Sequence, residues 1–224
     1  MSAPTKTATD SPGKPTSRTY NLFAGQSLGR LAALSDGVFA IAMTLLVLDL
    51  HVPDSRAIVG EADLWQALVA LSPRLIPYLM SFLTLGIFWV GQQTQLDLLE
   101  RSDRNLTWLQ LTFLLAVTIM PFSTGLLAEF TSHRLALVAY WLNILLLGAA
   151  LFVSGRYAAR ADLIRDDAPP EMSAAMERRI VVAQALYAFG ALLCAVNTYL
   201  SIAVIILVQL NYAIAPRIRP LFRL

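Results

Sequence analysis

The sequence predicts an all-α integral membrane protein with six transmembrane helices per chain, and three observations predict it. Of the 224 residues, 57% are hydrophobic and only 14% are charged, and the mean hydropathy is +0.60. Six long apolar segments follow one another, and lysine and arginine gather in alternate connections between them. A soluble domain needs more charge on its surface, so this composition excludes that class. The net charge of +2 is too small to indicate a nucleic-acid-binding protein.

The length of each apolar segment decides whether it can cross a bilayer. A helix needs about 20 apolar residues to cross about 30 Å of hydrocarbon. The first four segments satisfy this requirement, at residues 31–51, 65–91, 106–128 and 134–155. The last two segments are shorter and meet at Asn197, at residues 179–196 and 198–215. A re-entrant hairpin therefore competes with two spans there, and we favour two spans.

The basic residues predict the orientation and the domain organisation. Most lysines and arginines fall on the side of the membrane that holds both termini, which the positive-inside rule assigns to the cytosol. We expect a disordered cytosolic tail over 1–25, a six-helix transmembrane domain over 26–216, and a short basic cytosolic tail over 217–224. The connection 156–178 is too short for a domain and should extend the fourth and fifth helices. The expected location is the inner (plasma) membrane, surrounded by lipid, with the first span retained as an anchor because no cleavage site follows it.

The first span, RLAALSDGVFAIAMTLLVLDL over 30–50, carries a hydroxyl and a carboxylate among its apolar residues. At about 100° per residue, one face of this helix collects a set that we name the first-helix stripe. The stripe consists of Leu34, Gly37, Ile41, Thr44, Leu45 and Leu48. Asp36 lies about 140° away from the stripe by the same geometry. The carboxylate and the apolar stripe are therefore expected to meet different surroundings.

Asp36 needs polar surroundings, because a charged group in hydrocarbon costs several kcal/mol and normally faces protein or water. Placement at the cytosolic interface is one alternative, although the side chain is short. Donors on the second span are the other, and Trp89, Gln92 and Gln93 fall at the same depth if the topology is right. Trp89 alone is almost as well explained as an interfacial aromatic residue. Arg30 lies on a different helical face, so no intrahelical pair with Asp36 is expected.

These residues carry a resemblance. Arg30, Leu34, Ser35 and Asp36, followed by GVFAIAMTLLVLD, resemble the motif that opens the first helix in prokaryotic relatives of the endosomal/lysosomal potassium channel. The resemblance implies six helices per chain and a homotetramer, with the first helices around a central pore and no carbonyl-lined filter loop. This chain differs from the family pattern at Leu34, where phenylalanine is usual, and at Gln92 and Gln93, where histidines are common.

The resemblance also implies roles for single residues of the first helix. Ile41 matches the pore constriction, Thr44 matches a polar ring next to it, and Leu45 and Leu48 continue the apolar lining outward. The residues that match a packing network between helices are Arg30, Ser35 and Asp36, with Trp89 and Gln92 as expected partners. A straight helix would place Arg30 in the mouth of the pore, so we expect the start of the helix to deviate from straight helical geometry.

The function that follows is a passive potassium-permeable cation channel with a hydrophobic neck at Ile41. Asp49, near the outer end, is expected to raise the local concentration of cations. The alternative is a proton-coupled secondary transporter that uses Asp36, although its expected inverted repeat is not visible in the sequence. A non-conducting scaffold is a third possibility.

Enzymatic activity is not expected, because no nucleophile, base or metal cluster lies together in the sequence. His51 and His133 have no partners at metal-ligand spacing. We therefore expect no cofactor and no metal site, with potassium and other monovalent cations as the permeant species.

Overall fold

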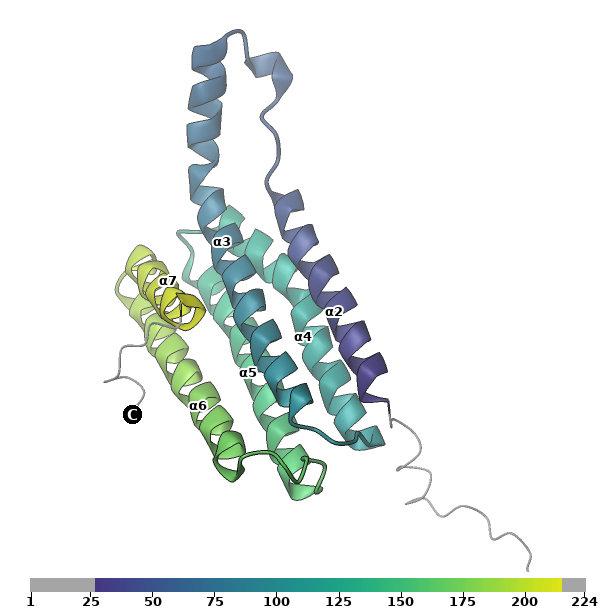
Figure 1. Cartoon of the computed structure of the whole chain (residues 1–224). Helices are drawn as coiled ribbons and strands as arrows, with labels where there is room; N and C mark the ends of the chain where they lie inside the picture. Colours follow the sequence, from purple (N-terminus) through teal and green to yellow (C-terminus); the bar gives the residue numbers. More distant parts are fainter. Residues whose placement is uncertain (1–26, 215–224) are drawn as a thin grey trace, which may run out of the picture.

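The computed structural model describes residues 27–214, and in this part of the chain α2 to α6 run side by side (Figure 1). Both predicted tails, 1–25 and 217–224, lie outside the described residues. The described residues form helices and connections, and only Leu99 and Ile164 pair as an isolated β-bridge. The elements are α2 (Leu28–Leu45), η1 (Leu46–Asp49), η2 (Ser55–Ala57), α3 (Glu61–Asp97), α4 (Arg104–Glu129), α5 (Arg134–Arg160), α6 (Pro170–Leu192), η3 (Leu193–Ala195) and α7 (Thr198–Ile214).

Among the described residues, five helices are long and apolar enough to cross a membrane. They are Leu28–Asp49, Glu61–Asp97, Arg104–Glu129, Arg134–Arg160 and Glu171–Ala195. These helices coincide with the first five predicted spans. α3 is longer than predicted, with 37 residues instead of the stretch 65–91. The sixth segment is the 17-residue helix α7, which is at the lower limit of length for a span.

The core of the bundle lies between α4 and α5, with the other helices packed around them. Completely buried side chains include Phe113 and Val117 from α4 and Leu137 and Ile144 from α5. α2 enters this core through Phe39, whose ring centroid lies 5.9 Å from that of Phe113. Away from this core, the outward faces of α2 and α3 are not covered by the rest of the described chain.

A buried polar cluster ties α3, α4, α5 and α7 together inside the bundle. The hydroxyls of Thr84 and Tyr140 lie 3.2 Å apart, and Thr124 donates to Ser81 at 2.6 Å. Gln209 of α7 donates to Thr84 at 2.7 Å. Buried polar groups need such partners because water is excluded. The cluster therefore fixes α7 against α3.

α7 returns along α6 in the opposite direction. Near the turn, the Ser201 hydroxyl donates to the Gly190 carbonyl at 2.6 Å, and a side chain at Gly190 would come within 3.0 Å of Ile205. At the other end of α7, the Arg179 guanidinium carbon lies 5.4 Å from the Tyr212 ring centroid. α7 packs against both α6 and α3.

The two connections at the end of the bundle opposite the α2–α3 connection are joined to each other. Glu100 N donates to Leu163 O at 3.0 Å, and Arg165 N donates to Leu98 O at 3.0 Å. The predicted extension of the fourth and fifth helices is confirmed, because α5 continues to Arg160 and α6 begins at Pro170. These bonds hold the inner ends of α3 and α5 at a fixed separation.

Candidate ion pathway

α2 is an apolar helix whose two opposite faces meet different surroundings. Its N-cap is Ser27, whose hydroxyl accepts from Arg30 N at 3.3 Å. The residues that α2 buries are Leu31, Ser35, Phe39 and Ala42, and η1 adds Leu46. Their spacing of three to four residues is that of one helical face. This face packs against α3 and α4.

The first-helix stripe lies on the other face and is exposed along its whole length. Ile41 is 61% exposed and Leu48 is 66% exposed, while Leu34 and Leu45 are also uncovered by the rest of the chain. An added Cβ at Gly37 would meet no atom within 4 Å. The angular prediction that these residues share a face is consistent with this common exposure. Their assignment as a pore lining stays a prediction.

Asp36 accepts two hydrogen bonds from α3. The indole Nε1 of Trp89 donates to its Oδ1 at 2.9 Å, and Gln93 Nε2 donates to the same oxygen at 2.7 Å. The structure thus brings together the carboxylate and two of the three donors that the sequence indicated. Asp36 is nevertheless exposed within the chain. Two neutral donors hold it on the flank of α2 that faces α3.

The third donor, Gln92, belongs to a separate buried network that begins at Ser35. The Ser35 hydroxyl donates to Gln92 Oε1, and Gln92 Nε2 donates to Gln110 Oε1 at 2.9 Å. Gln110 Nε2 then donates to Ser154 Oγ at 2.8 Å, and Ser154 Oγ donates to Gln95 Oε1 at 3.1 Å. A chain of amides and hydroxyls therefore links α2 to α5 through α3 and α4.

Sequence reasoning missed Gln95, Gln110 and Ser154. Each is a polar residue inside an apolar run, and each is buried. The signal that could have found them is depth, because Gln110 and Ser154 fall near the inner ends of their helices, as Gln92 does. An analysis of one helix at a time does not compare the depths of polar residues on different helices.

The expected deviation at the start of the first helix is wrong. α2 is α-helical from Leu28 onward, so Arg30 lies within the regular helix. The helix can begin there because Ser27 caps it and Leu31 is anchored in a small core with Leu96 and Leu106. Arg30 is exposed on the same side as the first-helix stripe, and the described residues offer it no ion pair.

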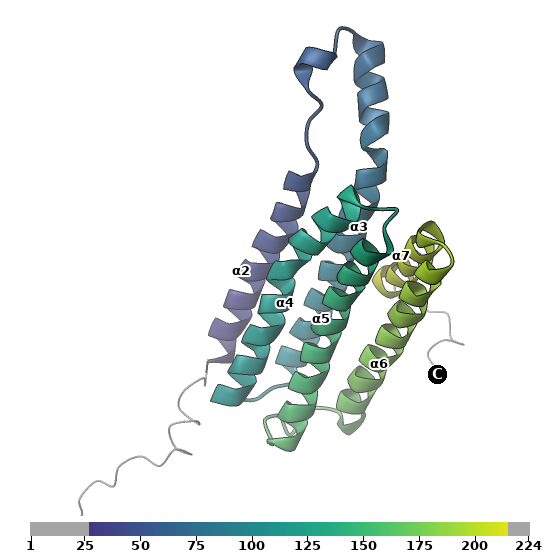
Figure 2. The same cartoon turned by 180° about the vertical axis from the view of Figure 1, so that it is seen from behind.

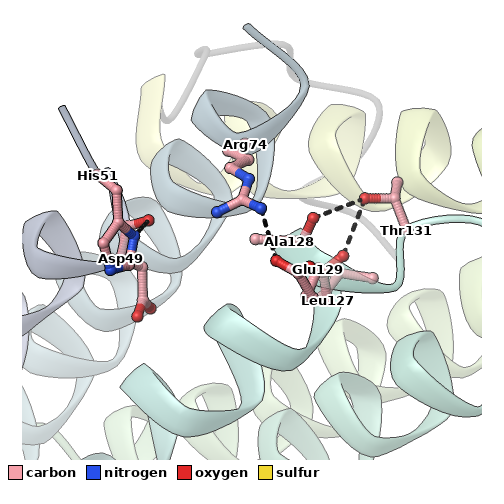
Figure 3. A network of polar contacts seen from close by, with 7 residues as sticks. All are labelled: Asp49, His51, Arg74, Leu127, Ala128, Glu129 and Thr131. Atoms are coloured by element: carbon pink, nitrogen blue, oxygen red, sulfur yellow. Dashed lines mark hydrogen bonds and ion pairs between the residues drawn. The ribbon is translucent and has the colours of Figure 1, made fainter. Parts of the chain in front are cut away.

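The outer end of α2 turns Asp49 away from the stripe. Residues Leu46–Asp49 form a 3₁₀ turn, which rotates successive side chains more than an α-helix does. The Asp49 carboxylate lies against α4, where an added Cβ at Gly125 would be 3.0 Å from Oδ2. This oxygen is buried without a hydrogen-bond partner among the described residues. Figure 3 shows Asp49 and His51 beside the ion pair between Arg74 and Glu129, whose Nη2 and Oε2 atoms lie 2.6 Å apart.

Comparison with known proteins places this arrangement in a family. The family described as "Endosomal/lysosomal potassium channel TMEM175" matches residues 30–121, which include the stripe, Asp36 and its partners on α3. A potassium channel of Chamaesiphon minutus is 34% identical over 190 residues, which are 83% of this chain and 93% of that protein. This chain belongs to the TMEM175 family. The resemblance seen in the first span is confirmed.

Other relatives of this TMEM175-family chain match over shorter stretches. A potassium channel of Streptomyces collinus is 45% identical over 102 residues, which are 46% of this chain and 48% of that protein. The human endosomal/lysosomal proton channel TMEM175 is 32% identical over 108 residues, 46% of this chain and 21% of that protein.

The fold also matches a solved structure. The crystal structure of a lysosomal potassium-selective channel TMEM175 homolog from Chamaesiphon minutus superimposes with a TM-score of 0.74 at 30% identity. The match covers 85% of this chain and 98% of that chain. The protein is therefore a multi-pass, all-helical member of a family of ion channels.

Proposed function

We propose that the protein is a passive potassium-permeable cation channel, assembled as a homotetramer with four copies of α2 around a central pore. The observation that carries this proposal is the uncovered first-helix stripe of α2, while the Asp36 carboxylate on another face of the same helix is bound to α3. The bacterial relatives are named potassium channels, which supports the choice of ion. Like those relatives, this protein would conduct ions rather than catalyse a reaction, and it would need no cofactor.

Ile41 is the proposed constriction. Its side chain is uncovered within the chain, so it is free to meet the same residue from other copies. A ring of isoleucines excludes water from a narrow neck, and small movements that widen such a neck let it fill again. Leu45 and Leu48 continue the apolar lining toward the outer end.

Thr44 is the proposed polar ring next to the neck. Its hydroxyl donates to the Ile41 carbonyl at 2.8 Å, so its proton is directed into the helix. A hydroxyl has one proton and two lone pairs, and this bond turns the oxygen outward as an acceptor. Four such oxygens would replace part of the hydration of a cation as it enters the neck. Selectivity between potassium and sodium would then be moderate.

The hydrogen bonds of Ser35 and Asp36 fix the direction of the stripe. Ser35 is bound to Gln92 and Asp36 is bound to Trp89 and Gln93, all on α3. A helix held by two adjacent polar residues cannot rotate without breaking these bonds. The network thus supports the proposal that the stripe, and not the acidic flank, faces the pore.

The proposed topology has six spans with both termini in the cytosol of the inner membrane. The sixth span would be α7, which packs against α6 and α3. The 17 residues of α7 correspond to about 26 Å, close to the thickness of the hydrocarbon layer.

Proton permeation is the second candidate, favoured by the vertebrate relatives that are named proton channels. A proton-coupled transporter would use Asp36 as its titratable group. The first-helix stripe contains no titratable side chain, so a proton would have to cross the neck through transient water. The two candidates can therefore be separated by whether ion flux depends on a proton gradient.

The test is potassium flux from liposomes that contain the purified protein, without a proton gradient. A channel releases potassium under these conditions, and Ile41→Asn should increase the flux because an amide wets the neck. The conservative Ile41→Val should change it little. A flux that occurs only with a proton gradient, and is insensitive to both substitutions, would favour the transporter.

A further inference from the structure

The connection after α2 and the first turns of α3 project beyond the ends of α4 and α5, as Figures 1 and 2 show. We name residues 50–73 the outer hairpin. It contains η2 and the part of α3 that precedes Arg74. The 13 residues from Glu61 to Pro73 correspond to about 20 Å of helix at 1.5 Å per residue. The described part of the chain barely covers this segment.

Charged residues indicate where the membrane ends on this side. Arg74 and Glu129 form an ion pair with 2.6 Å between Nη2 and Oε2, at the end of α4. From Arg74 to Asp97, α3 has a length of about 35 Å, which is enough to cross about 30 Å of hydrocarbon. The ion pair therefore lies near the outer boundary, and the outer hairpin extends beyond it.

The far end of the outer hairpin is also charged. The exposed residues there are Asp54, Arg56, Glu61 and Asp63. Asp63 Oδ2 accepts from Val59 N and Gly60 N, both at 3.1 Å, which caps the start of α3. Such an end belongs in water. On this placement the helix between these charges and Arg74 lies outside the hydrocarbon, so the crossing part of α3 begins near Arg74 and not at residue 65, where the predicted second span begins.

Despite this position, the helix between the two charged levels has an apolar seam. Leu64, Leu68, Leu71 and Leu75 follow each other at spacings of four, three and four residues. We name these residues the leucine seam. Leu68 is 47% exposed and Leu75 is 41% exposed. Alternating spacings of three and four are the pattern with which a helix packs against a second helix of the same kind.

The leucine seam faces the same flank of α3 that contacts α2 farther down. Leu68, Leu75, Phe82 and Trp89 succeed one another at intervals of seven residues, so they share one side of the helix. Trp89 is the residue that donates to Asp36 of α2. Beyond the end of α2, this side of α3 is no longer covered by α2. The seam is thus continuous with the α2 side of the chain.

We propose that the leucine seam is an interface between copies of this chain, so that the outer hairpins of neighbouring copies pack into a collar above the pore. The proposal rests on the assembly in the proposed function and extends it outside the membrane. A second copy is the occupant because the pattern is self-complementary, because the seam continues the α2 side, and because lipid chains do not reach past Arg74. In the collar, the ions would pass between the hairpins before they reach α2.

The test uses thiol cross-linking of the full chain in membranes. Cys194 is the only cysteine, so Cys194→Ser gives a background without thiols. In this background, Leu68→Cys places a thiol in the leucine seam, and Gln66→Cys places one on the opposite face of the same helix. Leu48→Cys, at the outer end of α2, reports on the assembly of the pore itself. All three residues are exposed within the chain, so the substitutions should leave its fold intact.

We expect a short thiol-to-thiol cross-linker to convert Leu68→Cys and Leu48→Cys to dimers, with loss of the monomer band, while Gln66→Cys stays monomeric. If Leu48→Cys cross-links and Leu68→Cys does not, the collar is wrong and the pore assembly stands. If Leu68→Cys cross-links alone, the collar stands and the axial position of α2 is wrong. Equal cross-linking of Leu68→Cys and Gln66→Cys would also overturn the collar, because it would indicate random collisions between mobile hairpins.

Discussion

α2 and α5 are both apolar helices of membrane-spanning length, yet the rest of the chain covers them to different extents. In α5, Tyr140, Asn143 and Ser154 are all buried inside the bundle with hydrogen-bond partners. In α2, Asp36 stays exposed although α3 binds it, and Ile41 is uncovered on another face of the helix. The difference teaches that α5 is covered on its polar side within the chain, whereas one face of α2 is left uncovered by it, which is the face that the proposed assembly would cover.

The largest expected effect is that of an asparagine substitution at a buried position of α5. Ile144 is completely buried between α4 and α6. Ile144→Asn should lower the free energy of unfolding on the order of 2–5 kcal/mol, because it removes apolar packing and buries an amide. The measurement is thermal unfolding in detergent, with yield from membranes as a second readout. The same exchange at Ile41 should leave the unfolding temperature close to wild type, and equal losses at both positions would contradict the contrast between the helices.

Asp36 connects α2 to the rest of the chain, so its removal should have the next largest effect. Asp36→Ala leaves the donors on Trp89 and Gln93 without their acceptor and should cost about 1–3 kcal/mol of stability. Asp36→Asn retains an acceptor oxygen and should lose less. Trp89 fluorescence gives a local readout alongside thermal unfolding. An Asp36→Ala protein as stable as wild type, with unchanged emission, would show that these bonds do not hold α2 in place.

The smallest expected effect concerns the connection between α5 and α6. An arginine there has an ion-pair partner within the chain, unlike Arg30 of α2, which has none among the described residues. In the connection between α5 and α6, Arg165 Nε and Nη2 donate to the two oxygens of Asp167 at 3.0 and 2.9 Å. These bonds lower the pKa of Asp167 below its ordinary value. The associated stabilisation is present above the ordinary pKa of the carboxyl and is lost as the pH falls through the lowered pKa.

Arg165→Ala should therefore raise the pKa of Asp167 to the ordinary range of an exposed aspartate, with little change in stability at neutral pH. A carboxyl titration by NMR measures this. Arg30→Ala is the matched control, since Arg30 has no ion pair among the described residues, and it should leave the Asp167 titration unchanged. A pKa of Asp167 that does not move in Arg165→Ala would mean that the pair does not persist in solution.

Much of the fold could be predicted from hydropathy, because a bilayer imposes a minimum length on each apolar helix. The donors for Asp36 could also be predicted, since Trp89 and Gln93 fall at its depth on the next helix. The buried links through Gln95, Gln110 and Ser154 could not, because they depend on which helices are neighbours. The direction of the Asp49 side chain could not be predicted from α-helical geometry, because Leu46–Asp49 form a 3₁₀ turn.

The position of the stripe is tested most directly by thiol modification during potassium flux. In a Cys194→Ser background, Thr44→Cys places a thiol on the stripe, on the outer side of the neck, and Leu142→Cys places one on the exposed face of α5. A positively charged thiol reagent added from the outside should block flux through Thr44→Cys and leave Leu142→Cys unaffected. Full modification of Thr44→Cys without any loss of flux would contradict the account, because the first helix would then not line the pathway.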